Sequence, residues 1–177
     1  VDGVTVVPGD MVFVFKGGTF EVAAKAGELH AVVVLVPGGK EGIARAGALP
    51  NRDAAGQKPA GAIVLHARDA KSFCFDHSHA SDCAGLTIFA EPPTIHASSL
   101  AASHLHAGNV PPHVHAHETE LLYVESGGGM FDVGGTKVAV TESSVVQVPP
   151  GIQHAFTGTV TALQIYTPAG PEQRFKK

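Results

Sequence analysis

The chain has 177 residues, of which 44% are apolar, and its formal net charge is −4 with only 12 lysines and arginines. This length suits one domain with an additional arm, and the apolar content is typical of a globular rather than a disordered chain. The few basic residues argue against a nucleic-acid-binding surface, which needs clustered positive charge. No apolar run approaches the length of a membrane-spanning helix.

Short runs rich in valine, isoleucine, phenylalanine and threonine alternate with turn signals along the chain. The runs predicted to be strands are residues 11–15, 31–36, 61–66, 86–90, 120–124, 137–140, 144–148 and 161–166. Their even spacing favours an antiparallel all-β sandwich or barrel. Gly134-Gly135 is predicted to form a hairpin turn between two strands. Helix signals are few, at residues 41–46 and 67–73.

A polar, turn-rich stretch at residues 49–60 predicts a surface loop between two parts of the chain. We therefore expect an N-terminal β-rich arm, residues 1–60, that packs on a histidine-rich barrel, residues 61–177. The longest apolar run of the arm, residues 31–36, is predicted to be one buried strand.

Two cysteines, Cys74 and Cys83, lie close enough in sequence to close a small loop. In an exported protein this spacing predicts a disulfide. Two free thiols are one alternative. His77 and His79 lie between the cysteines, so a second, soft-metal site is another. The chain begins with Val1 rather than methionine, and together with the paired cysteines this favours a periplasmic or extracellular protein. A cytoplasmic location stays open.

Five of the chain's 11 histidines lie between residues 104 and 117. Residues two apart on a strand face the same way, so His113 and His115 can direct their imidazoles at one ion. By the same rule His117 lines up with them if the strand continues. Glu120 opens the next predicted strand and offers a carboxylate. Periodicity alone leaves His117 and Glu120 as competing candidates.

A further histidine follows a turn downstream, in the sequence VPPGIQHAF. The turn at Pro149-Pro150-Gly151 ends one predicted strand and places His154 at the start of the next. In an antiparallel barrel that strand can lie beside the one that carries His113 and His115. A third imidazole can then reach the same point.

These residues, taken in order, resemble the two sequence motifs of the cupin superfamily. The spacing His113-x-His115-x4-Glu120-x6-Gly127 is similar to the first motif, and Pro149-x-Gly151-x2-His154 is similar to the second. The similarity covers about residues 98–175, with both motifs inside residues 108–158. It implies a small single-domain cupin: an antiparallel double-stranded β-helix, or jelly roll, with extra N-terminal strands.

The resemblance also implies a metal site. The ligands it assigns are His113, His115, Glu120 and His154, and it leaves His117 in a loop. Such a donor set suits one divalent ion of iron, manganese, zinc, nickel or copper, and ligand type does not choose among them. Cupins commonly dimerise, which implies a homodimer.

Residues on the same strands as the ligands are predicted to line a pocket. An apolar wall is expected from Leu122, Val124, Phe156 and Ile165. His104 and His106 share one face of the preceding strand, where they are expected either to line the pocket as acid/base groups or to be exposed or to support the ligands from outside.

A metal beside such a pocket suggests an enzyme, since the ion can activate an oxygen-rich small molecule as a Lewis acid or support oxygen chemistry. The sequence therefore predicts a metal-dependent dioxygenase or isomerase. The alternative is a non-catalytic cupin that binds or senses a metal or small ligand. No acid/base group can be placed firmly, so both hypotheses stay open.

Overall fold

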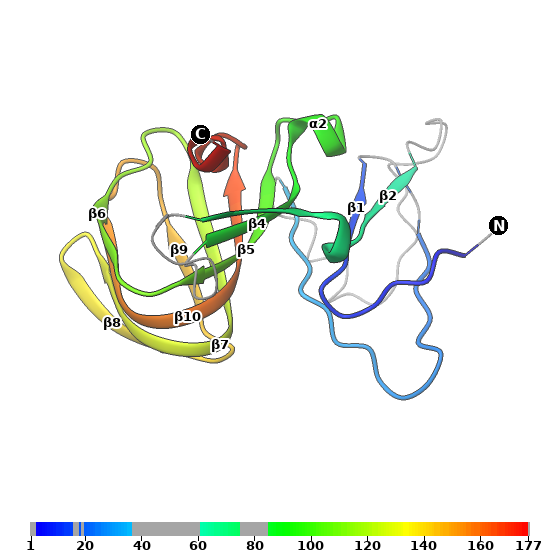
Figure 1. The fold of residues 1–177 in the computed structure, drawn as a ribbon, viewed down its shortest axis with the longest axis horizontal. Coiled ribbons are helices and arrows are strands. Elements are labelled where there is room, and N and C mark those ends of the chain that lie inside the picture. Colours follow the sequence, from blue (N-terminus) through cyan, green and yellow to red (C-terminus); the bar gives the residue numbers. More distant parts are fainter. Residues whose placement is uncertain (1–2, 16–17, 19, 37–60, 75–84, 177) are drawn as a thin grey trace, which may run out of the picture. The chain divides into compact units, whose positions relative to one another are not determined.

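The computed structural model describes residues 3–15, 18, 20–36, 61–74 and 85–176 of the chain (Figure 1). The chain divides into two compact units, Val1–Val64 and Leu65–Lys177. No helix within the described ranges is long and apolar enough to cross a bilayer. The predicted packing of the arm on the barrel stays a prediction.

The first unit contains β1 (Met11–Val14) and all but the last residue of β2 (Ala62–Leu65), which form a two-stranded sheet. Both strands were predicted from their valine- and isoleucine-rich sequences. The predicted buried strand at residues 31–36 is wrong, because this segment has no strand conformation and Val33 is 76% exposed. An apolar run forms a strand only where another strand pairs with it. The helix signal at residues 41–46 lies outside the described residues.

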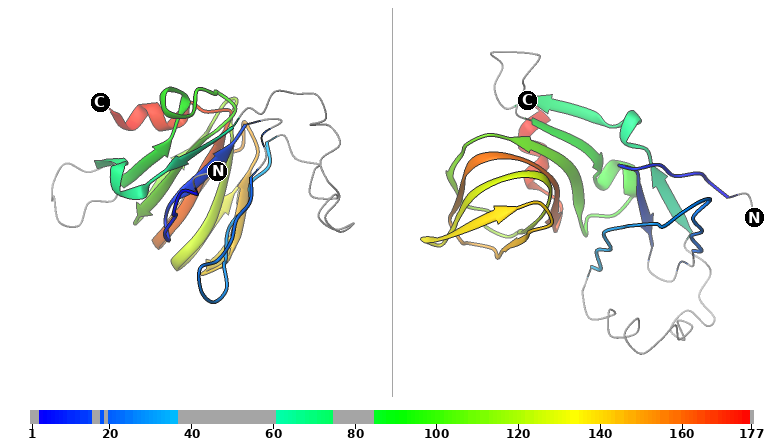
Figure 2. Two further views of the ribbon diagram at one scale, coloured as in Figure 1. Left: turned by 90° about the vertical axis from the view of Figure 1, so that its right-hand side faces the viewer. Right: turned by 90° about the horizontal axis from the view of Figure 1, so that it is seen from below.

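The second unit is a single antiparallel sheet that curls into a barrel, seen end-on in the right-hand view of Figure 2. Its main strand order is β3-β4-β5-β10-β7-β8, while β6 pairs with β10 and β9 pairs with β7. The strands are β3 (Lys71–Cys74), β4 (Gly85–Ala90), β5 (Ala101–Ala107), β6 (Val110–His113), β7 (Thr119–Val133), β8 (Thr136–Thr141), β9 (Val145–Val148) and β10 (His154–Thr167). The predicted all-β jelly-roll architecture is confirmed.

Helices are short in this unit. The predicted helix at residues 67–73 is a single 3-10 turn, η2 (Ala67–Asp69), and its second half forms β3 instead. A short helix, α2 (Pro92–Ile95), follows β4, and a 3-10 helix, η3 (Pro171–Lys176), follows β10. These last two elements were not predicted.

Two long strands organise the barrel. The 15 residues of β7 and the 14 residues of β10 pair along their whole length, from Thr119 opposite Thr167 to Val133 opposite His154. The first half of β7 also pairs with β9, and its second half pairs with β8. Because both strands bend, one pair of strands contributes to both faces of the barrel.

A β-bulge in β7 changes which residues face inward. Thr161 pairs with Ser126 and Ala162 with Val124, so Glu125 is the extra residue. Even-numbered residues such as Leu122 point into the core before the bulge, and odd-numbered ones such as Phe131 do so after it. The predicted hairpin turn is confirmed, because Gly134 and Gly135 join β7 to β8 with φ values of 59° and 85°.

Candidate metal centre

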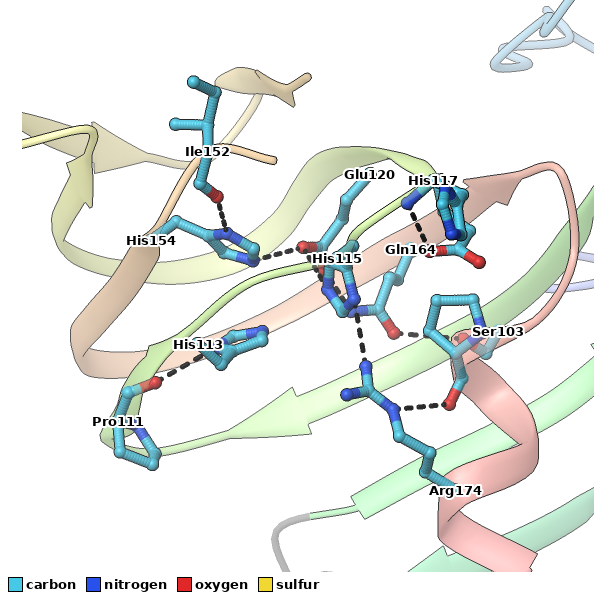
Figure 3. Close-up of polar contacts among 12 residues, drawn as sticks. Ser103, Pro111, His113, His115, His117, Glu120, Ile152, His154, Gln164 and Arg174 are labelled. Carbon is cyan, nitrogen blue, oxygen red and sulfur yellow. Dashed lines mark hydrogen bonds and ion pairs between the residues drawn. The ribbon is translucent and has the colours of Figure 1, made fainter. Parts of the chain in front are cut away.

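The structure brings four of the predicted site residues together at one end of the barrel (Figure 3). His113 ends β6, His115 follows it in the loop, Glu120 lies near the start of β7, and His154 begins β10. β10 carries His154 to this point because it lies between β6 and β7 and pairs with both. One nitrogen or oxygen from each residue lies within 4.8 Å of all the others.

Three side-chain atoms of this cluster are buried without a hydrogen-bond partner among the described residues: Nε2 of His115, Oε2 of Glu120 and Nε2 of His154. Glu120 Oε2 lies 2.8 Å from His154 Nε2 and 3.3 Å from His115 Nε2, but neither contact has hydrogen-bond geometry. Buried polar atoms almost always have a partner. Three such atoms that converge on one point fit a bound cation.

The donor set also fits a metal in chemistry and size. Three imidazole nitrogens and one carboxylate oxygen are ligands that divalent transition metals accept. With bonds of about 2.1 Å, donor atoms around one ion lie within roughly 4.2 Å of one another. Small side-chain adjustments therefore bring the 4.8 Å spread of this cluster into coordination range.

Two of the three imidazoles have the tautomer that a metal requires. Nδ1 of His113 lies 2.9 Å from the carbonyl oxygen of Pro111, and Nδ1 of His154 lies 3.0 Å from that of Ile152. A carbonyl oxygen only accepts, so Nδ1 donates and the neutral ring keeps a lone pair on Nε2. Such contacts fix the orientation of ligating histidines.

His115 has a different partner, which the sequence did not identify. Its Nδ1 lies 2.9 Å from Nη2 of Arg174, on η3. A guanidinium only donates, so Nδ1 accepts and the neutral ring carries its proton on Nε2. Ligation through Nε2 requires that proton to leave, so the contact with Arg174 must change when His115 binds a metal.

A buried polar chain holds the other oxygen of Glu120. Gln164 donates from Nε2 to Glu120 Oε1 at 2.5 Å, and Ser103 Oγ lies 3.3 Å from Gln164 Oε1. Gln164 is 4% exposed and comes from β10, two residues from Tyr166 on the same strand. These two hydrogen bonds fix the carboxylate of Glu120 so that its Oε2 faces the imidazoles. Strand alternation from Phe156 could have identified Gln164 as an inward residue.

The electrostatics of the site keep Glu120 ionised and Tyr166 protonated. Burial alone raises the pKa of Glu120, but the contacts with His115 and His154 and the hydrogen bond from Gln164 outweigh it and lower the pKa to about 2. Burial and the nearby charge of Glu120 raise the pKa of Tyr166 well above its usual range. For the imidazole of His113, burial disfavours the protonated form and therefore lowers the pKa.

We expect an acid-dependent loss of stability from Glu120 in metal-free protein. Because folding lowers its pKa, its stabilisation is fully present above the unfolded value of about 4.3 and is lost as the pH falls from there through about 2. Urea unfolding in EDTA at successive pH values should therefore show the wild type losing stability relative to Glu120→Gln across this window. A difference that stays constant from pH 6 to pH 2 contradicts the assignment.

A cavity of about 620 Å³ lies inside the barrel, and His113, Glu120 and His154 form part of its wall. Leu122, Val124 and Phe156, three of the residues predicted to line a pocket, lie on its wall. The same residues belong to the hydrophobic core, so the core itself encloses the cavity.

Three predicted pocket residues do not line the cavity. Ile165 is buried but faces the other side of β10 from Gln164 and Tyr166. His104 and His106 alternate with Leu105 and Ala107, which line the cavity, so both histidines point outward. His104 Nδ1 lies 3.7 Å from Glu125 Oε2, and His106 Nδ1 lies 3.1 Å from Thr161 Oγ1.

Other candidate residues lie outside the cluster. His117 is exposed, and its backbone N–H donates to Glu118 Oε2, so the geometry favours Glu120 over His117. Cys83, His77 and His79 lie outside the described residues, and the pairing of Cys74 with Cys83 stays a prediction.

The fold and this cluster define an antiparallel β-barrel protein with a candidate His3Glu metal centre on an internal cavity. Residues 102–166 match the family model of the cupin domain. The barrel belongs to the cupin superfamily. A search of curated proteins finds no match to this chain.

Several solved structures are similar to this chain at low sequence identity. Pac13 from Streptomyces, a nucleoside dehydratase also solved with uridine, is 18% identical over 62% of this chain and 84% of its own, with a TM-score of 0.50. An RmlC-like cupin from Shewanella frigidimarina is 14% identical over 60% of this chain and 90% of its own, with a TM-score of 0.49. KdgF from a Halomonas species is 18% identical over 58% and 98%, with a TM-score of 0.45.

Proposed function

We propose that this cupin is a metal-dependent enzyme that acts on a small, oxygen-rich organic molecule inside the barrel. The observation that supports this most is the convergence of three buried, unpartnered donor atoms at a 620 Å³ cavity whose wall includes Glu120 and His154. His113, His115, Glu120 and His154 would hold the ion. A divalent ion bound there supplies Lewis-acid activation of a substrate oxygen, or redox chemistry with oxygen.

The protein's own residues prepare the site for that chemistry. Gln164 and Ser103 hold the Glu120 carboxylate in one orientation, and the apolar side chains around the cavity exclude water. Tyr166 lines the cavity and stays protonated at neutral pH, and its hydroxyl hydrogen-bonds to Glu120, which helps to hold the carboxylate. These features support either an isomerase-like or a dioxygenase-like reaction.

The second candidate is a non-catalytic binding cupin, favoured by one observation. Apart from the ligands themselves, the described residues that line the cavity include few side chains able to accept or donate a proton at neutral pH. A bound ligand that is released unchanged would support this alternative.

Homodimer formation and export stay predictions.

Metal content is the first test of the proposed function. We expect the purified protein to hold about one divalent ion per chain by elemental analysis, and His154→Ala to lose most of it because a buried donor is removed. His106→Ala is the matched control, since His106 points away from the cavity. Equal metal content in wild type and His154→Ala contradicts the metal site.

Turnover separates the two reaction classes. Metal-loaded protein would be incubated with catechols, enediols and hydroxy acids while dissolved oxygen is measured. Oxygen uptake coupled to substrate loss supports a dioxygenase, and product formation without uptake supports an isomerase-like reaction. Release of every bound compound unchanged supports the binding module.

A further inference from the structure

We propose that Arg174 binds a carboxylate and that the cavity therefore takes a small organic acid with an apolar body. The proposal rests on the proposed function, because a second oxygen of the same ligand would bind the metal. It names a substrate class and a residue that selects for it.

The cavity has one polar region and a larger apolar one. His113, Glu120, His154, Gln164 and Tyr166 form the polar wall. Most of the other lining residues are aliphatic or aromatic, among them Leu86, Leu105, Phe131, Val140, Phe156 and Phe175. A ligand that fills this space needs an apolar body with oxygen atoms at one end.

Arg174 is the only arginine or lysine among the described residues that line the cavity. The residue as a whole is exposed to solvent, although its side chain reaches His115 (Figure 3). A side chain that both lines a cavity and meets solvent lies where the cavity opens. An entering anion would therefore meet Arg174 beside the metal ligands.

Two nitrogens of the guanidinium donate hydrogen bonds within the protein, and the third is available to a ligand. Nε of Arg174 donates to the carbonyl oxygen of Pro171 at 3.3 Å, and its Nη2 donates to His115. Nη1 has no hydrogen-bond partner among the described residues. The helix that carries Arg174 is anchored by Glu91, which accepts a hydrogen bond from Gln173 at 3.0 Å and pairs with Lys176.

Metal ligation increases the need for an acceptor at Arg174. If His115 binds the ion through Nε2 and stays neutral, its proton lies on Nδ1, where it faces an N–H of Arg174. Two donors cannot satisfy each other. A carboxylate can accept from both Nη1 and Nη2, since its two oxygens match the planar guanidinium fork.

The charge favours a carboxylate over a phosphate. Glu120 neutralises part of the charge of a divalent ion, and Arg174 adds one positive charge at the entrance. No second arginine or lysine lies on the described wall to bind the remaining oxygens of a phosphate. The apolar walls also favour an organic acid over a heavily hydrated dianion.

The test compares a carboxylate probe with its neutral counterpart. Mandelate has a carboxylate, a hydroxyl and an apolar ring, and mandelamide differs from it only in the charged group. Calorimetry would give both dissociation constants for wild type, Arg174→Gln and Arg68→Gln. Arg68 is the matched control because it is an exposed arginine on η2 that does not line the cavity. Elemental analysis would give the metal content of each sample.

We expect the preference for mandelate over mandelamide to fall about fivefold in Arg174→Gln and to stay unchanged in Arg68→Gln. Fivefold corresponds to about 1 kcal/mol, a value suited to an ion pair near solvent. Arg174→Lys, which keeps the charge without the fork, should restore part of the preference.

Two results would overturn the proposal. One is an unchanged preference in Arg174→Gln. The other is phenyl phosphate binding more tightly than mandelate through Arg174, which would identify a dianion site. Absence of metal from the wild type would instead overturn the proposed function, and the mandelate preference would still decide the role of Arg174.

Discussion

Replacing Glu120 by glutamine is expected to lower the affinity for a divalent metal by at least about a hundredfold. Loss of a group that merely orients a ligand typically costs 10–100-fold, and Glu120 offers its own oxygen to the ion. Glutamine keeps the size of the side chain and can still accept from Gln164, so the packing survives. What is lost is the negative charge, which the low pKa of Glu120 maintains at neutral pH.

The measurement is competition between the protein and a chelator of known affinity. Glu118→Gln is the matched control, because Glu118 lies two residues away and contacts the backbone N–H of His117 instead of the imidazole cluster. We expect Glu118→Gln to bind metal as the wild type does. Equal affinities for Glu120→Gln and the wild type would mean that the carboxylate is not a ligand.

The sequence predicted which residues form the His3Glu cluster because their spacing depends on local geometry. Alternation predicted that His113 and His115 lie together, although β6 ends at His113 and His115 lies in the loop after it. The proline-glycine turn places His154 at the start of another strand. The choice of Glu120 over His117 needed the family resemblance. Periodicity could not decide it, since the pattern indicates a bend before Glu120 but does not show at which residue the first strand ends.

Strands β5 and β6 were predicted only from the alternation of their histidines, because the rest of their sequences does not favour strands. β5 is rich in alanine and histidine, and β6 contains Pro111 and Pro112. Tertiary pairing overrides these preferences, since β5 lies between β4 and β10. β6 pairs only with β10 among the described strands, and such an edge position tolerates proline.

Arg174 and Ile165 show two other limits of the sequence. Arg174 reaches His115 only because η3 returns to the barrel, and no local pattern predicts that return. Ile165 was assigned to the pocket for its apolar character. Its neighbours Gln164 and Tyr166 face inward instead, because the polar groups there bind or border Glu120.

Replacing Gly129 by alanine is expected to destabilise the barrel by about 3 kcal/mol, because the added methyl group overlaps backbone atoms. A Cβ at Gly129 would lie 2.2 Å from the carbonyl oxygen of Thr157 and 2.9 Å from Cα of Gly158. These atoms belong to β10, the strand paired with β7 along its whole length. The two strands must separate to admit the methyl group, which weakens the pairing that both faces of the barrel share.

For a chain of this length, about 3 kcal/mol corresponds to a melting temperature lowered by roughly 6–12 °C, measurable by calorimetry. Gly108→Ala is the matched control, since the nearest atom to its added methyl group is 3.9 Å away. Both substitutions add the same methyl group, but only one forces it against a neighbouring strand. If Gly129→Ala and Gly108→Ala have the same melting temperature, β7 and β10 can move apart at their glycines without loss of stability.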